Sequence, residues 1–122
     1  MVSLFNKRQR GDAAEDQALK QLRAAGLKLI ARNYHCRRGE IDLIMREQQD
    51  IAFIEVRQRS RSDFGSAAES VTIHKQRRLL ATAKYWLSQH PQYANNPMRF
   101  DVIGIDAAGQ LNWIRNAFQD EG

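Results

Sequence analysis

Hydrophobic and polar residues alternate from residue 39 to residue 57, which predicts two consecutive β-strands. In the first strand, 39–47 (GEIDLIMRE), the apolar face consists of Ile41, Leu43 and Met45. In the second strand, 51–57 (IAFIEVR), one face holds Ile51, Phe53, Glu55 and Arg57, and the opposite face holds Ala52, Ile54 and Val56. The connecting sequence EQQD is short and polar, so the two strands should form a hairpin.

The register of this hairpin decides whether two acidic residues face each other. A loop centred on Gln48 and Gln49 places Asp42 directly opposite Glu55, whether the loop has two residues or four. An odd loop shifts the pairing by one position. Gln-Gln is a poor sequence for a tight two-residue turn, which favours Asn-Gly or Asp-Gly, so we expect a four-residue loop.

Asp42 and Glu55 are candidate metal ligands in this register. Like charges directly opposite each other destabilise a sheet. A cation between the two carboxylates turns that repulsion into coordination, and hard ions such as Mg²⁺ take oxygen ligands. The alternative is that both residues belong to the solvated face of a half-exposed hairpin, as polar strand faces often do.

A helix is predicted from Gly11 to about Ala25, with Gly26 well placed to end it. Its apolar stripe consists of Ala14, Ala18, Leu22 and Ala25. Asp12 is the expected N-cap, and residues 1–10 are expected to form a flexible basic arm. Glu15, three residues after Asp12, has two interpretations: it completes a capping box, which spacing alone favours, or it points from the helix into the acidic site.

The remaining pattern completes a sheet with helices against it. A strand is predicted over 27–34, a long polar segment over 58–70, and further strands over 98–105 and 111–118. A second helix should run from an N-cap at Thr72 to about His90, and its apolar stripe consists of Ile73, Leu80, Ala83 and Leu87. The order α-β-β-β-α-β-β predicts one mixed β-sheet flanked by helices, a single α/β domain over 1–122.

Charge favours a polyanionic partner. The formal net charge is +5, and a basic surface raises the local concentration of nucleic acid. The basic residues are clustered: Lys7, Arg8 and Arg10; Arg37 and Arg38; Arg57, Arg59 and Arg61; Lys75, Arg77 and Arg78. Each cluster taken alone could be an ordinary solvated face. Four clusters around a carboxylate pair suit a phosphodiester substrate, whose charge must be held while a metal ion acts on it.

Other classes of protein fit less well. Cys36 is the single cysteine, which excludes an internal disulfide and a cysteine-rich zinc site. No apolar run approaches the length of a membrane span, and the first ten residues lack the apolar stretch of a signal peptide. We therefore expect a cytoplasmic protein that does not bind membranes.

A set of motifs resembles the bacterial YraN family. The motifs are Gly11-x-x-x-Glu15-x-x-Ala18, Arg32-Asn33, Gly39-Glu40-Ile41-Asp42-Leu43-Ile44, Phe53-Ile54-Glu55-Val56-Arg57, Phe64-Gly65, Lys75-x-x-Arg78 and Arg99-Phe100-Asp101-Val102. That family is uncharacterised and is similar to Holliday-junction resolvases, with a restriction-endonuclease-like PD-(D/E)xK core. The resemblance implies a metal-binding pair at Asp42 and Glu55, with the carbonyl of Val56 as a further ligand, and a helix-borne acid at Glu15 that faces the site. It also implies a homodimer, because a four-way junction needs paired cuts.

The chain departs from the fold's E-x-K motif, because Arg57 stands where that motif has lysine. A guanidinium group stays charged, so Arg57 can hold a phosphate but cannot act as a base. A bound metal ion could activate the attacking water instead. Lys75, at the start of the second helix, has two interpretations of equal weight: it fills the missing ammonium position, or it is a surface lysine.

The leading hypothesis is a Mg²⁺- or Mn²⁺-dependent endonuclease-like protein that acts on branched or structured DNA. Its catalytic residues would be Glu15, Asp42, Glu55, Arg57 and Lys75, and its nucleic-acid-binding residues would be Arg59, Arg61, Lys75 and Arg78. The alternative is a non-catalytic nucleic-acid-binding module that retains the nuclease fold, which accounts for Arg57 more easily. A third interpretation, an adaptor whose basic face binds an acidic protein or an anionic membrane surface, ranks lowest because no strongly basic amphipathic helix of the membrane type is present.

Overall fold

The predicted order of elements is confirmed. The computed structural model describes residues 2–58 and 67–119, and gives only the backbone for residues 2–12. The elements are α1 (Val2–Ala24), β1 (Lys28–Cys36), β2 (Gly39–Glu47), β3 (Asp50–Gln58), a short 3-10 turn η1 (Ala68–Ser70), α2 (Ile73–Gln89), a second 3-10 turn η2 (Pro91–Tyr93), β4 (Met98–Ile105) and β5 (Leu111–Phe118). Arg59, Arg61 and the Phe64-Gly65 motif lie outside the described residues.

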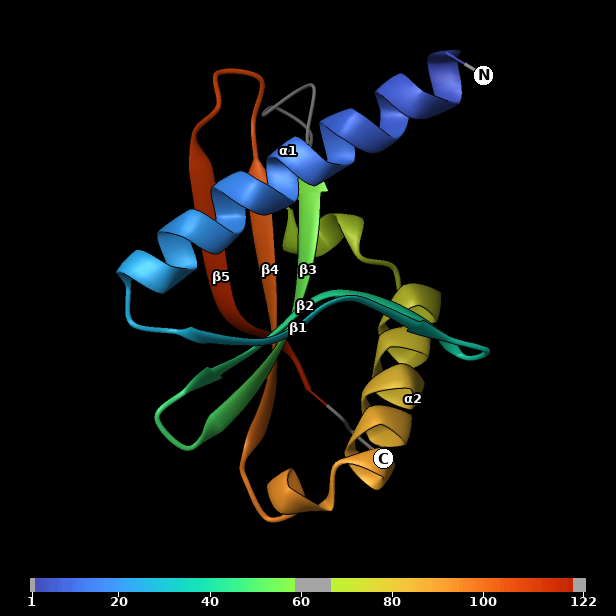
Figure 1. Cartoon of the computed structure of the whole chain (residues 1–122), viewed down its shortest axis with the longest axis vertical. Coiled ribbons are helices and arrows are strands. Elements are labelled where there is room, and N and C mark those ends of the chain that lie inside the picture. Colours follow the sequence, from blue (N-terminus) through green and yellow to red (C-terminus); the bar gives the residue numbers. More distant parts are fainter. Residues whose placement is uncertain (1, 59–66, 120–122) are drawn as a thin grey trace.

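The five strands form one mixed sheet in the order β1-β2-β3-β4-β5 (Figure 1). Only β3 and β4 are parallel, and the other neighbours are antiparallel. Parallel neighbours need a crossover connection, and α2 lies in the segment between β3 and β4. Along the chain, β3, the strand that carries Glu55, is therefore followed by η1 and then by the first turn of α2.

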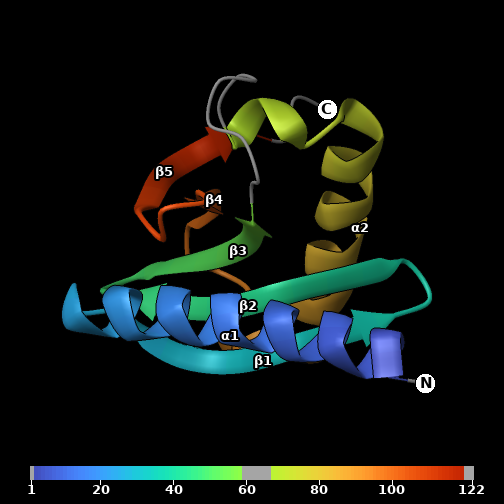
Figure 2. The same cartoon turned by 90° about the horizontal axis from the view of Figure 1, so that it is seen from above.

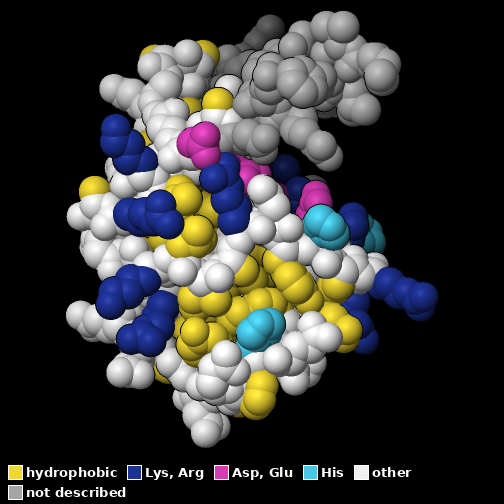
Figure 3. All heavy atoms as spheres, viewed as in Figure 1, with side chains coloured by type: hydrophobic (Ala, Val, Ile, Leu, Met, Phe, Trp, Pro, Cys, Tyr) yellow, Lys and Arg dark blue, Asp and Glu magenta, His cyan; other side chains and the backbone are white. Residues whose placement is uncertain are grey.

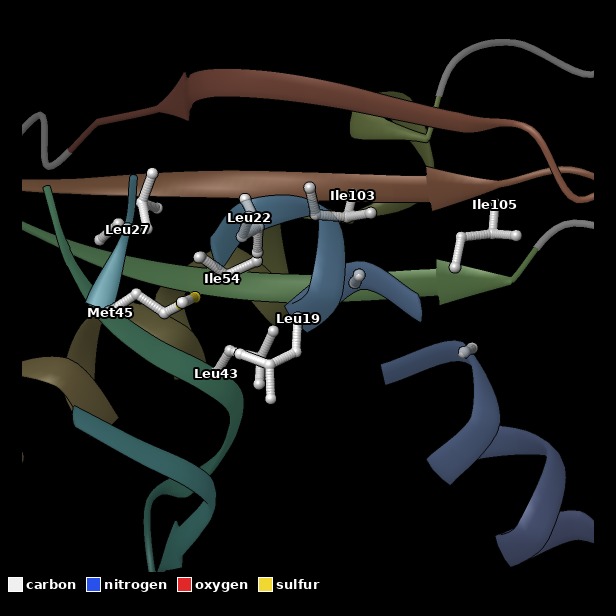
Figure 4. Packing of buried hydrophobic residues seen from close by; sticks show 11 residues of the cluster. Leu19, Leu22, Leu27, Leu43, Met45, Ile54, Ile103 and Ile105 are labelled. Atoms are coloured by element: carbon white, nitrogen blue, oxygen red, sulfur yellow. The ribbon is translucent and has the colours of Figure 1, made fainter. Parts of the chain in front are cut away.

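The two helices cover opposite faces of the sheet (Figure 2). On the α1 face, Leu19 and Leu22 pack against Leu43 and Ile54 in a fully apolar cluster (Figure 4). Burial of such side chains contributes roughly 1.5–3 kcal/mol each to the free energy of folding. The predicted stripe of α1 is buried at Ala14, Ala18 and Leu22, whereas Ala25 follows the helix and is exposed.

On the other face, Trp86 fixes the rotation of α2. Trp86 is 1% exposed, and its indole ring meets Phe53 edge-on, with ring centroids 5.9 Å apart. The buried residues of α2 are Leu79, Thr82, Ala83 and Trp86. The prediction that Ile73 faces the sheet is wrong, since Ile73 is 57% exposed. The bulky ring of Trp86 takes the central position and turns the first residue of the helix toward solvent.

The predicted beginning of α1 is also wrong. The helix begins at Val2 and continues through Asp12, so Asp12 is not an N-cap and Glu15 does not complete a capping box. Residues 2–10, which we expected as a flexible arm, form its first turns. Helical periodicity alone did not find this beginning because the segment contains no strong N-cap and few apolar residues.

The turn between β2 and β3 has two residues rather than the expected four. Glu47 pairs with Asp50, and Gln48 adopts a left-handed φ of 54°. The carbonyl of Gln49 accepts a hydrogen bond from Asn96 Nδ2 at 2.9 Å. This contact with the segment before β4 helps to hold a turn whose own sequence is unfavourable.

A second irregularity lies in the middle of β2. Leu43 and Met45 share a face, as predicted, and belong to the α1 cluster, but Ile41 belongs to the α2 cluster. The prediction that all three share one face is therefore wrong. On β1, Asn33 lies between the residues paired with Leu43 and Ile41 and has a left-handed φ of 54°. The backbone is thus irregular beside Asp42, and regular alternation fails there.

Candidate acidic site

Asp42 is attached to β3 through its side chain. The β2–β3 pairing has the predicted register, with Leu43 opposite Ile54, and it ends at this pair. One residue further, Asp42 Oδ2 accepts a hydrogen bond from the backbone N–H of Val56 at 2.8 Å. The carboxylate takes the place of a backbone acceptor, so the Asp42 side chain is held at the position where β2 and β3 separate.

The carboxyl groups of Asp42 and Glu55 interact directly. The pKa of Asp42 is raised to about 8, mainly by burial and further by the negative charge of Glu55 and a hydrogen bond between the two carboxyls. The Val56 N–H lowers the pKa and the more distant charge of Glu15 raises it, and both effects are smaller. The negative charge of Glu55 thus disfavours ionisation of Asp42, and a proton or a metal ion at Asp42 relieves this repulsion.

Glu55 lies on the α2 side of this pair, and two basic side chains lie next to its carboxylate. It is only 5% exposed. Lys75 Nζ lies 2.7 Å from Glu55 Oε2, and Arg57 Nη1 lies 3.7 Å from the same oxygen. The ammonium group makes the close ion pair, because it is 1 Å nearer than the guanidinium group.

Local structure at the beginning of α2 explains the position of Lys75. Thr72 is the predicted N-cap, and its hydroxyl oxygen accepts a hydrogen bond from the backbone N–H of Lys75 at 3.2 Å. Lys75 therefore lies in the first turn of α2, close to the end of β3. The Lys75 side chain is 37% exposed and its ammonium group pairs with Glu55, so the geometry agrees with the interpretation that places an ammonium group beside the acidic pair.

Arg57 is held mainly by η1. Its Nη2 donates a 2.8 Å hydrogen bond to the carbonyl of Ser70, and its Nε donates a 3.2 Å hydrogen bond to Ser70 Oγ. The Ser70 hydroxyl in turn donates to the carbonyl of Ala67 at 2.5 Å. Sequence reasoning missed Ser70, because a serine in a polar segment carries no signal of a long-range contact.

Glu15 points from α1 toward the sheet. Its side chain is 12% exposed, and its Oε1 accepts from Arg32 Nε at 3.3 Å. Arg32 also forms a 2.7 Å ion pair with Asp16, which fixes β1 against α1. The charge of Glu15 acts on Asp42, as the interpretation of a helix-borne acid requires. Arg32 was visible in the sequence motif, but its position could not be inferred without the fold.

The acidic residue of the last motif lies elsewhere. Asp101 is 1% exposed and accepts hydrogen bonds from Arg99 Nε at 3.1 Å, Trp113 Nε1 at 3.0 Å and the N–H of Asn116 at 2.9 Å. These donors satisfy a buried carboxylate and join β4 to β5. Asp101 therefore has a structural role, apart from the acidic site.

The chemistry of this site fits a divalent ion held by two protein carboxylates. Asp42 Oδ2 accepts from the Val56 N–H, Glu55 Oε2 pairs with Lys75, and the two carboxyl groups also interact with each other. Within the described residues, no group of three or more acidic, His or Cys side chains could enclose a metal ion. Mg²⁺ is commonly bound by one or two carboxylates, with water and substrate phosphate as the other ligands, so two carboxylates suffice.

The predicted nucleic-acid-binding residues are only partly placed. Lys75 lies in the acidic site, and Arg78 is exposed one turn further along α2. Arg59 and Arg61 lie outside the described residues. Among the described residues, no helix has the length and apolar character needed to cross a membrane.

Comparison with known proteins identifies the family. The model of a family described as "Uncharacterised protein family UPF0102" matches residues 14–105. A UPF0102 protein of Alcanivorax borkumensis is 44% identical over 99% of this chain and 100% of its own length. One of Nitrosococcus oceani is 47% identical over 93% and 94%, and one of Saccharophagus degradans is 50% identical over 88% and 91%. The resemblance to an uncharacterised bacterial family is thereby confirmed, and the chain belongs to the UPF0102 family.

Proposed function

We propose that this protein is a metal-dependent endonuclease-like phosphodiesterase that acts on branched or structured DNA, with a restriction-endonuclease-like core. The single observation that carries the proposal is the Asp42–Glu55 pair, two interacting acidic side chains with a lysine ammonium 2.7 Å from one of them. Buried like charges destabilise a fold, and perturbed pKa values cluster at functional sites. A hairpin that carries both acids, with a helix on each face of the sheet, agrees with the nuclease core implied by the motifs.

In this proposal Asp42, Glu55 and the carbonyl of Val56 hold Mg²⁺ or Mn²⁺. When bound, the ion neutralises charge on the phosphate and lowers the pKa of a water molecule. Lys75 supplies the positive charge that the E-x-K motif places on the strand, and it does so from α2. Its Nζ can donate a hydrogen bond to the attacking water or to a phosphoryl oxygen.

Two further residues complete the site. Arg57 uses Nε and Nη2 for Ser70, so Nη1 is the nitrogen that can reach a phosphate oxygen next to Glu55. Glu15 adds negative charge on the α1 side, where it strengthens the attraction for a cation. Because Arg32 holds Glu15, the position of this acid is fixed by the contact between β1 and α1.

The proposal is tested by cleavage of four-way-junction and flap DNA by the purified protein with Mn²⁺. The wild type should nick these substrates, and Asp42→Ala should not. Glu40→Ala is the matched control, because it removes an exposed carboxylate two residues away on the same strand. Circular dichroism verifies that both variants are folded. Equal cleavage by wild type and Asp42→Ala would refute the proposed chemistry.

One observation favours a second function, a non-catalytic nucleic-acid-binding module. Arg57 occupies the motif position of lysine, and two of its nitrogen atoms donate hydrogen bonds to Ser70, which holds the side chain against η1. Such a module binds DNA or RNA in a salt-dependent manner without divalent ions. Isothermal calorimetry separates the two functions: the nuclease gives a Mn²⁺ binding isotherm that Asp42→Ala abolishes, whereas the module binds nucleic acid and gives no Mn²⁺ isotherm.

A further inference from the structure

One stripe of α2 leads away from the acidic site. Its residues are Lys75, Arg78, Thr82, Tyr85 and Gln89, and successive members are three or four positions apart, so they share one face of the helix. Lys75 touches Glu55 at one end of this stripe. The stripe then follows the hairpin formed by β1 and β2.

The β1–β2 hairpin lies directly on this stripe. A Cβ atom on Gly39 would meet Thr82 Oγ1 at 2.9 Å and the Arg78 side chain at 3.8 Å, so only glycine allows this approach. The guanidinium carbon of Arg38 lies 4.6 Å from the centre of the Tyr85 ring. Cation–π contact of this kind holds an arginine in place without neutralising its charge.

Hydrogen bonds close the far end of the contact. Tyr34 of β1 donates to Gln89 Oε1 at 3.5 Å, and Gln89 Nε2 donates to the Tyr85 hydroxyl at 3.0 Å. The hairpin is therefore fixed to α2 at Gly39, at Tyr85 and at Gln89. We call the surface formed by Arg37, Arg38, Arg78 and Tyr85 the hairpin–helix seam.

Within the described part of the chain, the arginines of the seam have no carboxylate partner. Arg37 and Arg38 form the two-residue turn between β1 and β2, and both are exposed, as is Arg78. Where residues are described, none of these three arginines forms an ion pair with a carboxylate. Glu40 is the exposed acid next to the turn. In Figure 3 a basic side chain projects from the right edge, where Figure 1 places this turn.

The length of the α2 stripe that joins the acidic site to the seam suits a nucleic-acid backbone. Lys75 and Tyr85 are ten residues apart, which corresponds to about 15 Å along a helix at 1.5 Å per residue. One strand of a DNA duplex carries a phosphate about every 3.4 Å along the axis, so the stripe of α2 from Lys75 to Tyr85 in the seam spans the phosphates of roughly four base pairs. Guanidinium groups bind such phosphates bidentately.

We propose that the hairpin–helix seam binds the sugar–phosphate backbone of a DNA duplex and thereby directs an adjacent phosphodiester to Asp42 and Glu55. The inference rests on the proposed function for its substrate, and it adds Arg37, Arg38 and Tyr85 to the binding surface. Two turn residues and one helix stripe hold the duplex at a fixed distance from the acidic pair. This arrangement selects for DNA that continues as a helix beyond the point of cleavage.

Duplex binding is measured by fluorescence anisotropy with a labelled 20-base-pair DNA in EDTA, so that the acidic site does not contribute through metal. The double variant Arg37→Ala/Arg38→Ala should weaken binding roughly tenfold and reduce the slope of log affinity against log salt by about 2. The matched control is Lys20→Ala/Arg23→Ala, which removes the same charge from exposed positions of α1. The control should bind about as wild type does.

A seam variant that binds duplex as tightly as the control overturns the inference, while cleavage that depends on Asp42 would leave the proposed function intact. Wild type that binds no duplex overturns the inference as well, and so does wild type that binds anionic vesicles or an acidic peptide through Arg37 and Arg38 instead. Arg37→Lys/Arg38→Lys keeps the charge and should keep the salt slope. Arg78→Ala tests the same surface from the helix if the turn variant fails to fold.

Discussion

Lys75 lies in the first turn of α2, and its Nζ is 2.7 Å from Oε2 of Glu55 on β3. An ammonium group from α2 therefore lies beside Glu55, although residue 57 of the strand is an arginine. The same carboxylate is also approached by Arg57, at 3.7 Å. One acidic residue therefore has two cations beside it, and only the ammonium group is close.

Lys75→Ala should reduce both stability and cleavage. It leaves the buried Glu55 carboxylate without its close partner, which should lower the free energy of unfolding by about 1–3 kcal/mol. Urea denaturation measures this change, and the Mn²⁺-dependent nicking assay measures the loss of activity. Arg77→Ala removes an exposed charge from the same helix and should change neither quantity. Full activity in Lys75→Ala would remove Lys75 from the mechanism.

Without metal, the wild type should lose stability as the pH rises. The folded protein raises the pKa of Asp42 to about 8 from an ordinary value near 4. The stabilising effect of the protonated carboxyl is complete below pH 4 and is lost as the pH rises toward 8, by at most about 1.4 kcal/mol per pH unit. Denaturation in EDTA at several pH values, compared with Asp42→Asn, isolates this contribution. The stability of Asp42→Asn relative to wild type should increase between pH 4 and pH 8, and a constant difference contradicts the shift.

Mn²⁺ should raise the melting temperature of the wild type near neutral pH. A ligand that binds only the folded state stabilises it by about 3 kcal/mol when its concentration is one hundred times the dissociation constant. Asp42→Asn should show no such effect, because an amide replaces the charged ligand. Differential scanning fluorimetry with Mn²⁺, and with Na⁺ at matched ionic strength, gives the comparison. Equal shifts in both proteins would place the ion elsewhere.

Arg57→Lys should restore the sequence motif without increasing activity. The lysine loses the two hydrogen bonds to Ser70, so the free energy of unfolding should fall by about 1–2 kcal/mol. Lys75 already supplies an ammonium group at Glu55. Urea denaturation and the nicking assay report on the two effects. A large gain in cleavage would show instead that Arg57 limits the chemistry.

Gly39→Ala should be more destabilising than Gly109→Ala. Both glycines have a positive φ, 151° and 82°, so both variants carry backbone strain of about 1 kcal/mol or more. Only at Gly39 does the added Cβ also meet an atom of α2, Thr82 Oγ1 at 2.9 Å, whereas no atom lies within 4 Å at Gly109. Thermal denaturation should therefore rank the variants in this order, and the reverse order would argue against the contact between the hairpin and α2.

The acidic hairpin illustrates what local patterning can achieve. Alternation and a short polar connection were enough to predict β2, β3 and the register that pairs Leu43 with Ile54. The number of turn residues was wrong because Gln49 is held by Asn96, forty-seven positions away. The face of Ile41 was wrong because the backbone is irregular at Asn33, and residue type alone does not show this.

The sequence by itself determined the order of the elements, the family, the basic character of the chain and the two acids on adjacent strands, because each follows from residue type and short-range spacing. Only the tertiary structure decided that Lys75 joins Glu55, that Arg57 is held by Ser70 and that Arg38 rests on Tyr85. Each of these contacts crosses between elements whose relative position depends on the packing of both cores. Side-chain periodicity specifies the face of an element, whereas the partner on that face is specified by how the helices dock on the sheet.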